Sequence, residues 1–129
     1  EVPKDAMKGI LDAAYVFEGD RGFDKSSIID GLSKIGAIES NYTTKVQKDE
    51  GPARSYWQVE PVTAKDLLKN SSGLFGDKFN ETFAQYGEGD ETAYEVLADK
   101  SPKELSVLLE SDTSLGAAFA TAKMITTFN

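Results

Sequence analysis

The sequence predicts an α-rich fold, of the α+β class with at most a small β-hairpin. Apolar residues recur at helical spacing along most of the chain, and proline, glycine and capping residues mark the ends of seven helical segments. One stretch, residues 41–58, lacks this periodicity. With 129 residues and no break in composition, residues 1–129 are expected to form a single domain. The start at Glu1 is expected of a processed product or of a piece of a longer protein.

Two helices are predicted in the first third of the chain, over residues 3–17 and 26–40. Pro3 suits an initial helical position, and Gly19 lies just past the end of the first helix. In the second helix, apolar residues spaced by three or four positions lead to Glu39. Glu39 is therefore expected on the buried face, near the end of that helix.

Five more helices are predicted, over residues 60–70, 73–87, 91–99, 101–110 and 112–128. Asp90 is expected to cap the helix over 91–99. Ser101, three residues before Glu104, is expected to cap the helix over 101–110. One face of the helix over 73–87 is aromatic and is expected in the core, with Phe75, Phe79, Phe83 and Tyr86.

Residues 41–58 are predicted to form a loop or a short hairpin. β-branched and aromatic residues lie at both ends of this stretch, and Gly51-Pro52 interrupts its middle. An irregular segment of this length inside a compact domain is usually a binding or catalytic loop. Function is therefore expected here, directly after Glu39.

Composition excludes several kinds of site. The chain contains neither cysteine nor histidine, which excludes disulfides, thiolate metal sites and catalysis by Ser-His-Asp or Cys-His groups. No metal or cofactor is expected. The net charge is -8 and the 14 basic residues are dispersed, so nucleic acid is not an expected partner. No apolar run is long enough to cross a bilayer, so no membrane insertion is expected. The protein is also expected to be a monomer.

Glu39 is the main candidate for acid chemistry. Burial disfavours the charged form of a carboxylate, so a Glu on an apolar face is expected to keep its proton near neutral pH. That is the state that a general acid needs. The alternative is a solvated residue at a helix end, or a carboxylate paired with Lys45 or Arg54.

The residues around and after Glu39 carry a resemblance. Glu39-Ser40 at a helix end, followed by GPARSYWQVEPVTA over residues 51–64, resembles the signature of lytic transglycosylases and goose-type lysozymes. Ser55 stands where the second glycine of that signature is usual. The Trp-Gln-x-Glu form looks more like the peptidoglycan-degrading proteins of tailed bacteriophages. The outright matches are Ala53, Gln58, Pro61, Thr63 and Ala64.

The resemblance implies a lysozyme-like fold and cleavage of peptidoglycan. Glu39 would protonate the glycosidic oxygen of the β-1,4 bond between N-acetylmuramic acid and N-acetylglucosamine. In a lytic transglycosylase, the resulting carboxylate takes the proton of the muramoyl 6-hydroxyl, a 1,6-anhydro product forms, and one carboxylate suffices. A hydrolytic lysozyme (muramidase) more often needs a second carboxylate, for which Asp49 and Glu50 are the candidates.

The resemblance also implies substrate-binding residues. Ser40 would orient the acid, and Gln58 would bind an N-acetyl group or Glu39 itself. Tyr42, Tyr56 and Trp57 offer flat faces to sugar rings. Of Tyr56 and Trp57, one is expected to face the groove and the other to pack in the core.

Tyr94 is a further candidate, because TAYE over residues 92–95 loosely matches the Ala-Tyr-Asn segment of lytic transglycosylases. Glu95 stands at the Asn position, and the aromatic-rich tail of the phage relatives is absent. These departures leave open a non-catalytic peptidoglycan-binding or virion structural module, and an unrelated helical interaction domain is a third hypothesis. The phage-like form implies a phage virion or phage-encoded protein, such as an endolysin, that acts on the bacterial cell wall in the periplasm.

Overall fold

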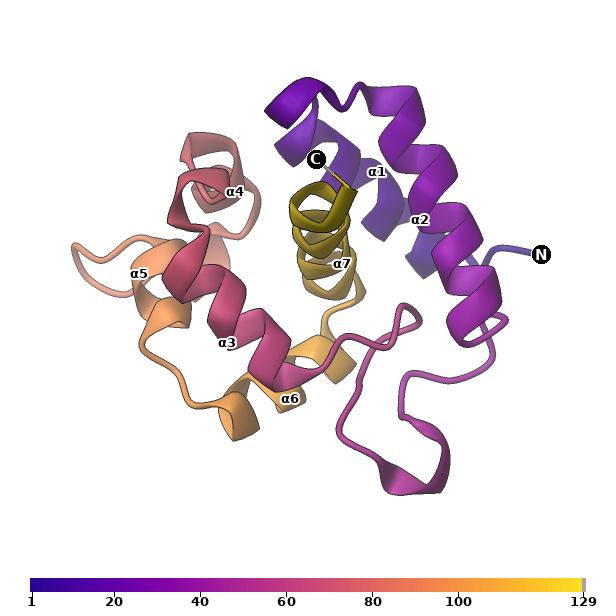
Figure 1. Cartoon of the computed structure of the whole chain (residues 1–129). Helices are drawn as coiled ribbons and strands as arrows, with labels where there is room; N and C mark the ends of the chain where they lie inside the picture. Colours follow the sequence, from indigo (N-terminus) through magenta and orange to yellow (C-terminus); the bar gives the residue numbers. More distant parts are fainter. Residues whose placement is uncertain (129) are drawn as a thin grey trace.

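The computed structural model describes residues 1–128, which are mostly helical (Figure 1). The α-rich prediction is therefore confirmed. Within this described part no longer strand forms, and isolated antiparallel bridges join Val46 to Arg54 and Arg54 to Val59. The predicted loop is thus a bridged loop rather than a regular hairpin. The helices of the described part are α1 (Lys4–Phe17), α2 (Lys25–Glu39), α3 (Pro61–Asn70), α4 (Asp77–Thr82), α5 (Ala93–Ala98), α6 (Pro102–Ser111) and α7 (Thr113–Phe128).

Helix α7 lies at the centre of the molecule. It contacts α1, α2, α3 and α6, and Figure 1 shows it with α1 and α2 on one side and α3 to α6 on the other. A helix that is apolar on nearly all sides is expected to be surrounded by other helices. Its predicted apolar face is fully buried, and it consists of Leu115, Phe119, Ala122 and Ile125.

The aromatic stretch over residues 73–87 does not form the single helix that was predicted. Gly76 has an extended backbone (φ −94°, ψ −151°), and only α4 and two short 3-10 turns form in this range. The extended break turns Phe75 so that its ring lies edge-on to Phe17 and Phe79, with centroids 6.2 and 4.9 Å away. The predicted burial is confirmed for Phe75, Phe79 and Phe83, whereas Tyr86 is only partly buried against the core. Tertiary packing of these rings here outweighs helical periodicity.

Capping chemistry sets the start of two helices in the second half. Ser101 accepts a hydrogen bond from the backbone of Glu104, whose side chain accepts one from the backbone of Ser101, as predicted for α6. The prediction that Asp90 caps α5 is wrong. Thr92 caps it instead, because Glu95 lies three residues later and completes the same reciprocal box.

Among the helices of residues 1–128, none combines the length and the apolar character needed to cross a bilayer.

Candidate functional site

Glu39 is the last residue of α2, and it is exposed rather than buried. The expectation of a buried acid is therefore wrong. The buried line on α2 runs through Ile28, Leu32 and Gly36 and continues to Ser40, one residue beyond Glu39. Because the buried residues recur every fourth position and Glu39 is not one of them, its side chain faces solvent in the last turn of α2.

The two cations considered as partners of Glu39 are engaged elsewhere. Lys45 pairs with Asp5, with the Nζ and Oδ2 atoms 2.9 Å apart. Arg54 pairs with Glu110, with Nε and Oε1 3.2 Å apart. Among residues 1–128, no ion pair includes Glu39.

Two neighbouring cavities meet at Glu39, and Gln58 and Lys123 line both of them together with it. The first, called the apolar cavity, has a volume of about 240 Å³. Its other lining residues are mostly apolar and include Ile35, Trp57, Val59, Ala120, Met124 and Phe128.

The second, called the polar cavity, has a volume of about 530 Å³. Most of its other lining residues are polar, and they include Ser40, Asn41, Thr44, Gln47, Lys48 and Glu60. Glu39 thus lies where an apolar and a polar surface adjoin. Sugars present both hydroxyl groups and apolar C–H faces, and a site of mixed lining suits such a ligand.

Gln58 and Glu39 line the same two cavities. Its backbone has a positive φ of 51°, and its Nε2 donates a hydrogen bond to the carbonyl oxygen of Ser55 at 2.8 Å. This bond fixes the amide against its own loop. The amide is therefore held at the junction of the cavities by a local contact.

The three aromatic candidates, Tyr42, Tyr56 and Trp57, lie between α2 and α3 and pack against one another in edge-to-face contacts. Trp57 is 3% exposed, and its Nε1 donates to the carbonyl oxygen of Leu32 at 2.9 Å. Tyr42 donates its hydroxyl proton to the carbonyl oxygen of Ser33 at 2.9 Å. Of the three, Trp57 reaches the apolar cavity, whereas Tyr42 and Tyr56 line neither cavity at Glu39.

Ser40 and Tyr94 make backbone contacts. The Ser40 hydroxyl donates to the carbonyl oxygen of Gly36 at 3.2 Å and accepts a bond from the Tyr42 backbone N–H at 3.1 Å. Ser40 therefore shapes the end of α2 and lines the polar cavity beside Glu39. Tyr94 lies on α5, donates to the carbonyl oxygen of Leu68 at 2.7 Å and lines neither cavity.

Asp49 and Glu50, the candidates for a second carboxylate, are exposed at the far end of the loop and line neither cavity. Glu60 does line the polar cavity, at the residue that precedes α3. Neither Glu60 nor Lys123 was among the residues that the sequence predicted for the site. Lys123 is the single charged residue of α7, and this is a signal that could have identified it.

The loop between α2 and α3 has an unusual backbone. Outside this loop, only Arg21 among the non-glycine residues of the described chain has a positive φ. Ser55 is the notable case, because φ is 71° while the side chain is 1% exposed and its Oγ accepts a bond from the Trp57 backbone N–H at 3.1 Å. Sparsely populated backbone conformations of this kind concentrate at functional sites.

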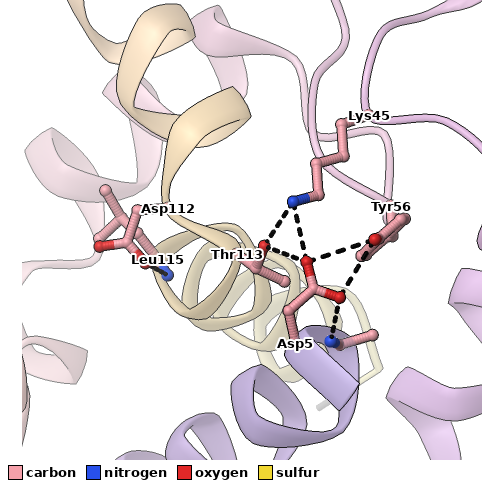
Figure 2. A network of polar contacts seen from close by, with 7 residues as sticks. Asp5, Lys45, Tyr56, Asp112, Thr113 and Leu115 are labelled. Carbon is pink, nitrogen blue, oxygen red and sulfur yellow. Dashed lines mark hydrogen bonds and ion pairs between the residues drawn. The ribbon is translucent and has the colours of Figure 1, made fainter. Parts of the chain in front are cut away.

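One carboxylate ties this loop to two helices (Figure 2). Asp5, at the start of α1, accepts hydrogen bonds from Lys45 at 2.9 Å, from Thr113 of α7 at 3.1 Å and from the Tyr56 hydroxyl at 3.1 Å. Lys45 also donates to the Thr113 hydroxyl oxygen at 2.8 Å. The cluster therefore holds the loop against the ends of α1 and α7.

Protonation of Asp5 is linked to this cluster. Partial burial raises the pKa of the Asp5 carboxyl, but the hydrogen bonds from Lys45, Thr113 and Tyr56 and the charge of Lys45 outweigh it and lower the pKa below 3.8. A lowered pKa means that folding favours the carboxylate. The stabilisation is therefore present above the ordinary pKa and is lost as the pH falls through the lower folded value.

Asp5→Asn is expected to lower the free energy of unfolding by about 1 kcal/mol at about pH 7. The value is modest because the Asp5 side chain is 45% exposed and solvent screens its interactions. The difference from wild type should disappear as the pH falls below 3.8 and wild-type Asp5 takes up a proton. Urea unfolding at several pH values measures it.

Asp30→Asn is the matched control for this experiment. Asp30 pairs with Lys34 at 3.0 Å, but both side chains are highly exposed. Its replacement should change the free energy of unfolding by no more than about 0.5 kcal/mol. Equal effects of the two substitutions would contradict the role assigned to Asp5.

Within residues 1–128, no group of three or more acidic side chains is placed to hold an ion. The side chains of Glu39, Gln58 and Lys123 offer a carboxylate, an amide and an ammonium group at the site. Comparison of the chain with protein-family models, with curated proteins and with solved structures finds no match.

Proposed function

We propose that the protein cleaves the glycan strands of peptidoglycan, with Glu39 as the general acid and base, in a lysozyme-like fold. The observation that carries this proposal is the position of Glu39 beside Gln58 at the junction of the apolar and polar cavities. Both residues belong to the motif that resembles lytic transglycosylases. The phage-like form of that motif favours a phage-encoded protein that acts on the bacterial cell wall.

The backbone at Ser55 supports the same assignment. Glycine is usual at this position of the motif, and a φ of 71° is a conformation that glycine adopts without steric cost. Ser55 also lies against α7, where a Cβ added to Gly116 would come within 2.6 Å of the Ser55 Cβ. The loop therefore has the conformation that a glycine motif is expected to encode.

In the proposed mechanism Glu39 acts first as the general acid and then as the general base. The acid gives its proton to the glycosidic oxygen as the bond from that oxygen to the muramoyl C1 breaks. The carboxylate so formed takes the proton of the muramoyl 6-hydroxyl, whose oxygen bonds to C1 and yields the 1,6-anhydro sugar.

This route needs one carboxylate, which Glu39 supplies. Asp49 and Glu50, the second carboxylates expected of a hydrolase, lie outside both cavities. The hydrolytic alternative uses a water molecule in place of the 6-hydroxyl. Glu60 is then the carboxylate best placed to direct that water, since it lines the polar cavity.

The chemistry of the product ends tests the proposal. Purified protein is incubated with peptidoglycan, and the released fragments are analysed by mass spectrometry. Anhydro-muramoyl ends are expected, because the 6-hydroxyl is the acceptor. Reducing ends would indicate a hydrolytic lysozyme rather than a transglycosylase. Binding to peptidoglycan without release of fragments would support a non-catalytic module instead.

A further inference from the structure

Phe128 lies in the wall of the apolar cavity, at the end of α7. Its side chain is 73% exposed, although the other phenylalanines of α7 and α4 are fully buried. Removing an exposed aromatic ring from water is favourable, so a ligand that covers this ring gains binding free energy from the contact. The ring therefore offers a flat apolar surface next to Glu39.

The rest of the apolar cavity fits a single small ring. Its volume of about 240 Å³ is below the roughly 300 Å³ at which typical ligand pockets begin. Ile35, Val59 and Met124 supply apolar surface, and Trp57 also lines the cavity, with its indole N–H already bonded to the carbonyl oxygen of Leu32. These residues thus offer apolar contact and no free indole donor.

Polar residues also line this cavity. They are Glu39, Gln58, Lys123 and Thr127, and the first three also line the polar cavity. A purely apolar ligand would leave these groups desolvated without partners, which is unfavourable. A pyranose ring suits both kinds of lining, because its C–H face contacts the apolar surface while its hydroxyl and acetamido groups bond to the polar groups.

We propose that the apolar cavity is a subsite for one N-acetylated pyranose ring, and that Phe128 is the residue on which the apolar face of that ring stacks. The inference deepens the proposed function, on which it rests for the identity of the sugar. It adds a substrate-binding residue outside the motif around Glu39. The polar cavity then takes the neighbouring sugar on the other side of the carboxyl.

Calorimetric titration with a trimer of N-acetylglucosamine tests the subsite. Glu39→Gln is the background, so that the trimer is not consumed. Phe128→Ala is expected to weaken binding about five- to tenfold, which is the effect of losing one aromatic contact. Phe128→Trp should retain binding, because it keeps a flat aromatic face.

Val107→Ala provides the matched control. Val107 is 64% exposed on α6 and lines neither cavity at Glu39, so its replacement should leave trimer binding within about twofold of the parent. The single tryptophan, Trp57, gives a second readout, since its emission should change on binding through its place in the apolar cavity.

The outcomes separate this inference from the proposed function. Trimer binding that is equally strong with Phe128→Ala overturns the subsite, even if wild-type protein cleaves peptidoglycan. Failure of the parent to bind the trimer also overturns it. Phe128-dependent binding by a protein that releases no fragments would support the subsite and would refute the catalytic proposal.

Discussion

Replacement of Glu39 with glutamine is expected to lower the rate of peptidoglycan cleavage by at least about a hundredfold, the usual minimum for loss of a general acid. Glutamine keeps the size of the side chain but has no proton to give to the leaving oxygen. Because Glu39 is exposed and makes no ion pair within residues 1–128, the free energy of unfolding should barely change. Release of soluble muropeptides over time measures the rate.

Two other carboxylates serve as controls for Glu39. Glu50→Gln, in the same loop but outside both cavities, should leave the rate unchanged. Glu60→Gln, in the polar cavity, separates the two reaction routes: a transglycosylase should lose little, whereas a hydrolase that uses Glu60 should lose most of its activity. If Glu39→Gln released muropeptides as fast as wild type, Glu39 would not be the acid.

Replacement of Phe119 with alanine is expected to lower the free energy of unfolding by about 3–5 kcal/mol, the usual cost of truncating a buried phenylalanine. Phe119 is fully buried in the middle of α7, and its ring lies 5.7 Å from that of Phe75. Truncation leaves a cavity where several helices meet, and it removes contacts between α7 and the helices around it. Urea unfolding followed by circular dichroism measures the change.

Phe128→Ala is the control for Phe119→Ala, since it makes the same change in the same helix. Phe128 is 73% exposed, so its loss should alter stability by no more than about 0.5 kcal/mol. The two substitutions should therefore separate stability from sugar binding. Comparable losses of stability would show that the end of α7 is packed more tightly than its exposure indicates.

Helix positions followed closely from local chemistry, and the exceptions have physical causes. The Ser101 and Glu104 pair predicted the start of α6 because a capping box needs only neighbouring residues. The interruption at Gly76 was not predicted, because it depends on the contacts of Phe75 with rings from α1 and α7. Such contacts lie far apart in the sequence and leave no local period.

The candidate site was also predicted only in part, because some of its residues come together through contacts between distant segments. The motif linked Glu39 with Gln58, and the two line the same cavities. The exposure of Glu39 was not predicted, because periodicity becomes unreliable in the last turn of a helix. Lys123 and Phe128 reach the site only through the packing of α7 beside α2, which no short stretch of sequence encodes.

Contact between α1 and α7 joins the two ends of the described chain. Because α1 leaves the ribosome before α7, the apolar side of α1, with Ile10 and Phe17, lacks its α7 contacts until that later helix is made. This part of the core thus closes only when α7 emerges, and the long loop closed by the contact slows the step. Until then, the nascent chain exposes apolar surface that a chaperone could bind.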